Sequence, residues 1–296
     1  MRTGYALVLA SALMYGAFHV ITKLSYTELR PLTSAGWSML FACLLLGPLV
    51  GVRKRWKEVI DRRALPSLIG MTLIIVVGVY GVIFLSLQLT SASNVAILST
   101  TEMLTTILFL TILTRHERFS ASRAWGSIAM FLGVILILFG GATTPNWGDA
   151  LILIAPLLAP WGNVLQKRAR TMVSGEAMYF FRSLVGGSIL LFFALVFEPL
   201  PSAAAFGANL PLLLLNGIVI FGISKLLWVE GLHRMPITTA IPLVNSSAVF
   251  TMVFAFLILH EPIRIHQVLA LIPVFFGIWL LTRVKGKALK DLPEEP

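Results

Sequence analysis

The sequence predicts an all-α membrane protein in which ten transmembrane helices form two inverted five-helix repeats around a central cavity. Three observations lead to this fold class. The chain is 57% apolar and 12% charged, whereas soluble proteins average roughly 45–50% apolar and about 25% charged residues. One residue pattern occurs twice along the chain. Lys and Arg gather at alternate joints between the apolar runs.

The repeated pattern runs through residues 91–137 and returns at 237–280. In each copy a small polar start leads into an apolar helix that ends in a His-Glu pair, and a second apolar helix with a central Gly follows. A shift of 144 residues aligns the copies without a gap and places Gly133 on Gly277. Internal repetition on this scale indicates two halves of one design.

The same alignment divides the chain into three parts. We predict a first five-helix repeat at 1–142, a second and inverted repeat at 145–286, and a cytoplasmic tail at 287–296. Each repeat is too apolar to be a soluble domain. The repeats are therefore expected to share one membrane-embedded core.

The expected helices follow from bilayer thickness, because a core of about 30 Å needs roughly 20 apolar residues per helix. On that length they lie at about 3–25, 32–52, 65–88, 91–114, 122–140, 147–167, 176–197, 210–231, 236–258 and 266–283. Pro, Gly or charged residues mark most of the joints between them. The first run is not followed by a small-residue cleavage site, so we expect it to be retained as a helix.

Lys and Arg predict the orientation of these helices. One set of joints carries Arg53, Lys54, Arg55, Lys57, Arg62, Arg63, Arg115, Arg118, Arg123, Lys167, Arg168, Arg170 and Arg234. The opposite joints carry little beyond Arg30 and Arg264. Positive loops face the cytoplasm, so both termini are expected to be cytoplasmic in a multi-pass protein of the cell inner (plasma) membrane. Because five spans per half is an odd number, the second half enters from the other side, as in many secondary transporters.

The remaining composition excludes several classes of protein. The net charge of +10 lies mostly in these short loops, so it does not indicate nucleic acid as a partner. Cys43 is alone within an apolar run, so neither a disulfide framework nor a metal site is expected. We expect no cofactor.

Two five-helix halves, each with a Glu at the end of its fourth helix (Glu117 and Glu261) and a Gly in its fifth, resemble the EamA family of the drug/metabolite transporter superfamily. The likeness covers about residues 3–283. It implies that the first four helices of each half line a central cavity and that the fifth and tenth pack outside it. It also implies metabolite export, commonly of amino acids or related compounds. Family members often carry a Pro midway along the fourth helix and its repeat partner, where this chain has Glu102 and Ser246.

Ionisable residues deep within a span are functional candidates, because each costs roughly 2.5–3.5 kcal/mol on insertion scales. Here they are His19, Glu102, Arg182 and Lys225. We favour Glu102 as a cavity carboxylate that binds a proton or a cationic group, with a structural bond to a neighbouring helix as the alternative. Arg182 and Lys225 could receive a substrate carboxylate. Alternatively, one of them pairs with Glu102 or Glu230 and only locks the bundle.

Aromatic and amide side chains complete the predicted substrate-binding set. They are Tyr15, Trp37, Tyr80, Trp161, Asn163, Tyr179, Trp228 and Asn245. Polar and aromatic residues share one face of the first span at helical spacing, which favours a cavity lining over helix packing. Trp and Tyr also prefer the membrane interface, so both roles stay open. Lys23 and Lys167 each end a helix, where interfacial anchoring and a gate are alternatives.

The leading functional prediction is a secondary transporter, and more specifically an exporter, of small organic metabolites such as amino acids or related zwitterions. A transporter of organic cations such as quaternary amines is the alternative, with Glu102 inside an aromatic cage. An intramembrane enzyme or lipid-handling protein is disfavoured, because the sequence offers no nucleophile–base or metal-ligand set. The expected partners are a small-molecule substrate and the lipid bilayer. Proton coupling and a homodimer are left open.

Overall fold

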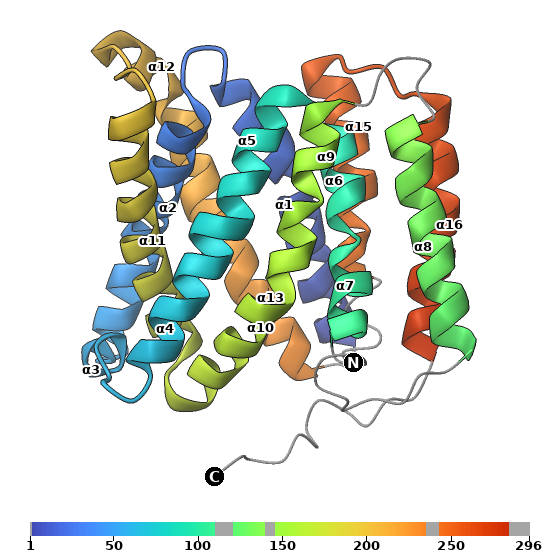
Figure 1. Ribbon diagram of the computed structural model, residues 1–296. Helices are drawn as coiled ribbons and strands as arrows, with labels where there is room; N and C mark the ends of the chain where they lie inside the picture. Colours follow the sequence, from blue (N-terminus) through green and yellow to red (C-terminus); the bar gives the residue numbers. More distant parts are fainter. Residues whose placement is uncertain (1, 110–120, 140–145, 235–242, 284–296) are drawn as a thin grey trace.

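The computed structural model describes residues 2–109, 121–139, 146–234 and 243–283, and every regular element in these ranges is a helix (Figure 1). Six helical runs are long and apolar enough to cross a membrane, namely Thr3–Ser25, Pro31–Val52, Leu65–Leu89, Trp147–Met172, Gly175–Phe197 and Ala203–Gly231. Three shorter apolar helices lie at Trp125–Phe139, Leu243–Leu259 and Ile265–Leu280. The all-helical, membrane-spanning class is confirmed. The described residues supply six runs of spanning length and not the ten expected.

The first half begins with long helices and becomes more broken toward its end. Its elements are α1 (Arg2–Ser25), α2 (Pro31–Val52), α3 (Trp56–Val59), α4 (Leu65–Met71), η1 (Thr72–Tyr80), α5 (Gly81–Leu89), α6 (Ala92–Ser99), α7 (Glu102–Leu108) and α8 (Ala121–Phe139). Pro31 opens α2 at a position whose N–H has no helical partner in any case. Ser91 caps α6, since its Oγ accepts a hydrogen bond from the backbone N of Asn94 at 3.0 Å. The His116-Glu117 pair and the expected tail at 287–296 lie outside the described residues.

The second half has a corresponding set of helices. Its elements are α9 (Trp147–Ile152), α10 (Ile154–Met172), α11 (Gly175–Phe197), α12 (Ala203–Leu214), η3 (Leu215–Ser224), α13 (Lys225–Arg234), α15 (Ser247–Leu259) and α16 (Ile265–Arg283). Asn146, Ser174 and Ser202 cap α9, α11 and α12 with their side-chain oxygens. Small polar residues therefore set where these helices begin.

The two halves also share their irregularities. A π-helical segment interrupts the third helix of the first half as η1 and the third helix of the second half as η3, at matching positions under the 144-residue shift. The fourth helix breaks at Thr100 and Thr101 in the first half, and at Ser246 in the second. π-Helical turns are rare and frequent at functional sites. The family often has Pro at the positions of Glu102 and Ser246. The fourth helix of this chain is therefore interrupted at or next to these positions without a Pro.

Repeat-related helices run in opposite directions. In Figure 1, α1 begins at the lower end of the molecule, whereas its counterpart α9–α10 begins at the upper end. The last described helix, α16, ends at the lower end where α1 begins. We call these the lower and upper ends below.

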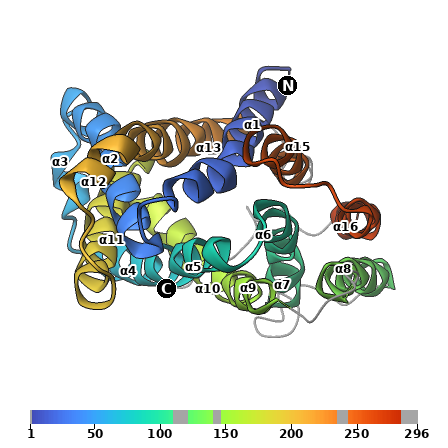
Figure 2. The ribbon, with the colours of Figure 1, turned by 90° about the horizontal axis from the view of Figure 1, so that it is seen from above.

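Packing brings the helices into two groups that each mix both halves, with α6 between them, packed against α15 and α1 as well as against α9 and α5 (Figure 2). In the first group α1 packs against α15, η3 and α13, and α2 packs against η3. In the second group α10 packs against α4, η1 and α7, while α5 packs against α9 and α11 against η1. Since each group takes its helices from both repeats, neither repeat forms a separate body.

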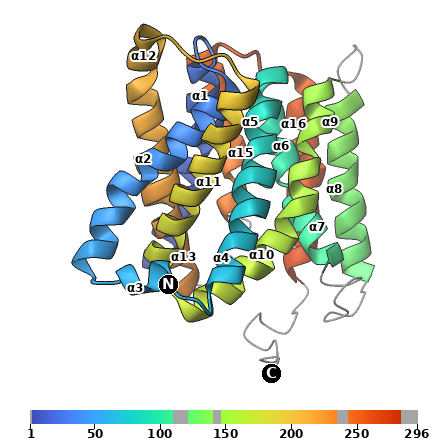
Figure 3. The ribbon, with the colours of Figure 1, turned by 60° about the vertical axis from the view of Figure 1, so that its left-hand side comes forward.

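The two groups are joined most extensively along the α2–α11 pair, whose helices run side by side (Figure 3), and also where α2 packs against α5 and α6 packs against α15. At the upper end Glu198 accepts hydrogen bonds from the backbone N of Leu32 at 2.7 Å and of Thr33 at 2.8 Å. These donors lie at the N-terminus of α2, where negative charge is stabilising. At the lower end Arg53 pairs with Glu176 at 2.9 Å. Polar contacts thus join α2 and α11 at both ends, and we describe the pair as fastened there.

Helices α8 and α16 pack on each other at the edge of the molecule (Figure 2). Their contact depends on two glycines related by the repeat. A Cβ on Gly133 would lie 2.5 Å from Val274 Cγ2, and a Cβ on Gly277 would lie 2.6 Å from the backbone oxygen of Gly126. These helices therefore approach closely enough to exclude even a methyl group.

We predict that Gly277→Ala destabilises the protein by about 1–3 kcal/mol, because overpacking forces the two backbones apart. The measurement is the midpoint of thermal unfolding of the purified protein in detergent. Gly207→Ala is the matched control, since a Cβ there meets nothing within 4 Å. Equal unfolding midpoints for the two variants would contradict the close α8–α16 contact.

Candidate functional site

The centre of the candidate site is the ammonium group of Lys225, the first residue of α13. Lys225 Nζ lies 4.1 Å from the ring centroid of Tyr15 and 5.9 Å from that of Tyr80. Tyr80 is the last residue of η1, and Lys225 follows η3 directly. Both π-helical segments therefore end at this site, where the two rings stabilise the cation by cation–π attraction.

Glu102 supplies the carboxylate of the site from the other helix group. It is the first residue of α7, directly after the break in the fourth helix. Its Oε1 accepts a hydrogen bond from Asn163 Nδ2 of α10 at 2.7 Å. Lys225 lies within electrostatic reach of this carboxylate. The predicted residues Glu102 and Asn163 thus meet, although they come from two helices and both halves, with Lys225 nearby but beyond ion-pair distance of the carboxylate.

Arg182 on α11 is buried at 3% exposure, yet its guanidinium is only partly bonded. Nη1 donates to Gln166 Oε1 at 3.2 Å, and Cζ lies 4.5 Å from the ring centroid of Tyr179. Among the described residues, neither Nε nor Nη2 of Arg182 has a hydrogen-bond partner. Arg182 also interacts electrostatically with Tyr15 and Tyr80. Buried donors are normally satisfied, so these two unpaired donors indicate a place for a ligand.

His19 borders the site from α1. It is 2% exposed, and its Nδ1 lies 3.3 Å from Thr251 Oγ1 of α15. The ring also packs against Phe18 and Tyr15, with centroids 4.9 and 5.8 Å apart. Within the described part of the chain its Nε2 has no hydrogen-bond partner. Lys225 is close enough to His19 to interact with it electrostatically.

Two of the predicted tryptophans lie against other aromatic residues. Trp37 packs on Phe206 of α12 with centroids 5.1 Å apart, in the N-terminal part of α2. Trp161 is 49% exposed and packs on Phe109 at 4.7 Å. The described contacts do not bring either ring to Lys225.

The remaining predicted residues are Trp228 and Asn245. Trp228 packs with Val8 in a small apolar cluster apart from the main core. Asn245 is half-buried in the helical turn at 243–245 that precedes α15. Their roles in binding stay predictions.

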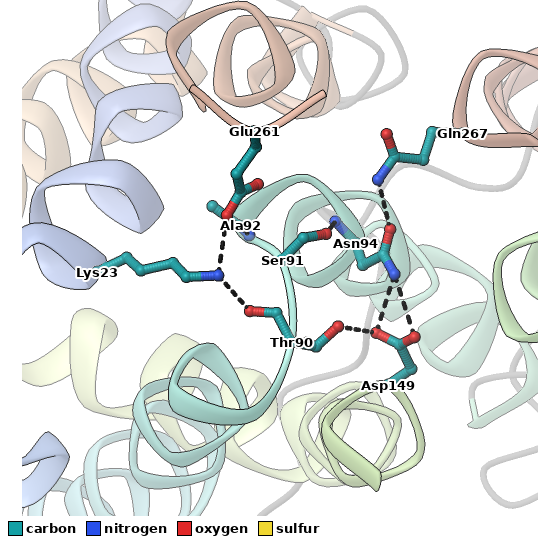
Figure 4. A network of polar contacts seen from close by, with 8 residues as sticks. All are labelled: Lys23, Thr90, Ser91, Ala92, Asn94, Asp149, Glu261 and Gln267. Carbon is teal, nitrogen blue, oxygen red and sulfur yellow. Dashed lines mark hydrogen bonds and ion pairs between the residues drawn. The ribbon is translucent and has the colours of Figure 1, made fainter. Parts of the chain in front are cut away.

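A second polar cluster, which the sequence did not single out as a site, lies at the upper end (Figure 4). It contains Lys23, Thr90, Asn94, Asp149, Glu261 and Gln267, all joined by hydrogen bonds or an ion pair. A pocket of about 720 Å³ opens beside it. The repeat drew attention to Lys23 and Glu261. The other members are polar residues near helix ends. Polar residues are common at such positions, so their presence there does not indicate a functional site.

A multi-pass helical protein built from two repeats of opposite direction, with buried charges between two helix groups, has the architecture of a membrane transporter. Comparison with known proteins agrees. The EamA-like transporter family matches the chain twice, over residues 2–139 and 146–283, so the chain belongs to that family. It is a transporter and not an enzyme.

Two individual proteins resemble the chain over nearly its whole length. "Uncharacterized transporter YoaV" of Bacillus subtilis (strain 168) is 24% identical over 285 residues, which cover 93% of this chain and 95% of that protein. A solved structure described as "Crystal structure of protein" superposes with a TM-score of 0.69 at 15% identity, covering 95% of this chain and 96% of the other. The second likeness shows the fold alone.

We predict that Arg182→Met stabilises the protein by about 1–3 kcal/mol, the penalty of a buried unsatisfied polar group, because Met fills the space without unpaired donors. The measurement is thermal unfolding in detergent without added ligand. Arg53→Met is the control: it removes a bonded guanidinium and leaves Glu176 without that ion pair. A lower unfolding midpoint for Arg182→Met than for the unsubstituted protein would assign Arg182 to locking the bundle.

Proposed function

We propose that the protein is a secondary transporter that carries small zwitterionic metabolites, such as amino acids, across the inner membrane by alternating access of two inverted repeats. In this topology six long helical runs and four shorter passes, α6–α7, α8, the pass containing α15, and α16, give ten spans. The positive joints then place both termini in the cytoplasm. The resemblance to the drug/metabolite transporter superfamily favours export.

The position of the site supports this proposal. Tyr15, His19 and Lys225 belong to the first helix group, whereas Tyr80, Glu102, Asn163 and Arg182 belong to the second. A ligand bound among them contacts both groups at once. Such a site at the interface of moving bodies is what alternating access requires.

The single observation that carries the choice of substrate is the pair of unpaired donors on Arg182. A guanidinium binds a carboxylate through two parallel hydrogen bonds, with a fixed geometry that Lys lacks. Glu102 offers the opposite charge, held in place by Asn163. A molecule with both a carboxylate and an ammonium group therefore satisfies both ends of the site.

Glu102 is also the carboxylate that we propose for proton coupling.

The organic-cation alternative is less well supported. Lys225 already occupies the face of Tyr15, the place that a quaternary amine would take. Lys225 and Arg182 together would also repel a cationic substrate. The residues expected to form an aromatic cage around Glu102 are Trp37, Tyr80, Trp161 and Trp228. Of these four, the described contacts bring Tyr80 alone to this centre.

We predict that amino acids stabilise the purified protein against heat and that quaternary amines do not. A ligand at 100 times its dissociation constant adds about 2.7 kcal/mol to the free energy of unfolding. The measurement is a thermal-shift screen of both compound classes. Glu102→Gln removes the charge that receives the ammonium group, so the stabilisation by amino acids should be lost.

Glu28→Gln is the matched control for that substitution. Glu28 is exposed and, like Glu102, accepts a hydrogen bond from an Asn side chain, here Asn209 at 3.1 Å. Its response to amino acids should equal that of the unsubstituted protein. Stabilisation by quaternary amines but by no amino acid would contradict the proposal, and so would an undiminished amino-acid response in Glu102→Gln.

A further inference from the structure

The polar cluster at the upper end joins the end of α1 and the residues after α15 to the α5–α6 turn, α9 and α16 (Figure 4). We call it the upper latch and define it as Lys23, Thr90, Asn94, Asp149, Glu261 and Gln267. It lies at the end opposite to the start of α1 and the end of α16 (Figure 1). In the proposed topology this is the outer end.

The first part of the upper latch centres on Lys23 at the end of α1. Its Nζ donates hydrogen bonds to Glu261 Oε1 at 2.8 Å and to the backbone oxygen of Thr90 at 2.6 Å. The same Glu261 oxygen accepts a hydrogen bond from the backbone N of Ala92 at 3.1 Å. The side chains of Lys23 and Glu261 are only 28% and 16% exposed. These charge-assisted bonds are therefore stronger than those of a solvent-exposed pair.

The second part holds the α5–α6 turn in place. Asp149 of α9 is 4% exposed and accepts a hydrogen bond from Thr90 Oγ1 at 2.5 Å. Asn94 Nδ2 donates to both carboxylate oxygens of Asp149 at 3.1 Å. Asn94 Oδ1 in turn accepts a hydrogen bond from Gln267 Nε2 of α16 at 2.7 Å. Asp149 thus positions Thr90, whose backbone oxygen bonds to Lys23, and Asn94, which bonds to Gln267.

The bonds of the upper latch fall into two kinds. Those from Asp149 to Thr90 and Asn94 join α9 to the α5–α6 turn, and the Lys23–Glu261 pair joins α1 to the residues after α15. Those from Lys23 to Thr90 and from Ala92 to Glu261 join α1 and the residues after α15 to the α5–α6 turn. Separation of this turn from α1 and α15 breaks the second kind of bond and leaves the first kind intact.

We propose that the upper latch is the outer gate of the transporter: its bonds between the groups hold the outer end shut and break together when that end opens. The α2–α11 pair, fastened at both ends, supplies the contact that persists while the groups rock. Rigid-body rocking about one preserved interface is an established form of such transitions. This inference rests on the alternating-access part of the proposed function and does not depend on the substrate.

The test measures access from outside to a position below the latch. Ser99 is half-buried on α6, between Asn94 and Glu102. Ser99→Cys in a Cys43→Ser background gives a single reporter, and intact cells are treated with a membrane-impermeant thiol reagent. We expect Lys23→Gln and Glu261→Gln each to speed labelling about tenfold, the effect of losing a hydrogen bond to a charged group in a two-state equilibrium. The double substitution Lys23→Glu with Glu261→Lys restores the ion pair but neither hydrogen bond to the α5–α6 turn, so its labelling should be as fast as that of Lys23→Gln.

Two controls distinguish opening of the gate from a general loosening of the protein and from a reversed topology. Glu28→Gln changes an exposed residue outside the latch, which accepts a hydrogen bond from Asn209 at 3.1 Å, and should leave labelling of Ser99→Cys unchanged. Trp147→Cys lies above the latch at 84% exposure in the structure and should be labelled quickly in every background. Failure of this second control would contradict the proposed topology and not the latch.

Equal labelling rates at position 99 in the unsubstituted latch and in Glu261→Gln would overturn the inference. The same holds if the charge-swapped protein is labelled at the slow rate, since the ion pair alone would then keep the end closed. Where Lys23→Gln does not accumulate in the membrane, Glu261→Gln decides the outcome alone.

Discussion

The cost of removing charged side chains from water is the constraint on which this structure depends. Inside a bilayer a charged side chain must pair with another group of the protein. A buried charge that remains unpaired indicates a functional site. The two polar clusters meet this constraint differently. In the upper latch Lys23 and Asp149 are satisfied by their neighbours. In the central site Arg182 keeps two unpaired donors. In the proposed function the first arrangement holds one end closed, and the second is completed by a ligand.

The repeat places matching backbone irregularities in the two halves of the chain. Each half breaks its fourth helix and loosens its third into a π-helical segment at matching positions. In the assembled molecule the two π-helical segments end at the same centre, where Lys225 Nζ lies 5.9 Å from the ring centroid of Tyr80. The side chains at the matching positions of the fourth helices differ, with Glu102 in one half and Ser246 in the other. A symmetric backbone therefore carries an asymmetric set of charges, which suits the zwitterion that we propose as the substrate.

Much of the fold and part of the site could be predicted from the sequence. Helices follow from runs of apolar residues, and the repeat follows from direct comparison of the halves. Glu102, Arg182 and Lys225 stand out because an ionisable residue within an apolar run is anomalous. The tryptophans were harder to assign, because a Trp serves lipid, a neighbouring helix or a ligand equally well. Trp161, half exposed beside Phe109, shows this ambiguity.

The upper latch and the mixed helix groups could not be predicted. Asn94, Asp149 and Gln267 lie near helix ends, where polar residues are common, and their contacts join positions up to 173 residues apart in sequence. Helical periodicity shows which face of a helix is apolar but not which helix covers that face. Only the folded arrangement shows that α1 packs with α15 while α10 packs with α7.

The central claim is that Arg182 receives the carboxylate of the substrate. Calorimetric titration of an amino acid and of the matching amine without its carboxylate, into the unsubstituted protein and into Arg182→Met, tests it most directly. We predict that the preference for the amino acid falls by about 1.5–3 kcal/mol in the variant, the value of a hydrogen bond to a charged group. An equal preference in both proteins would show that the carboxylate binds elsewhere.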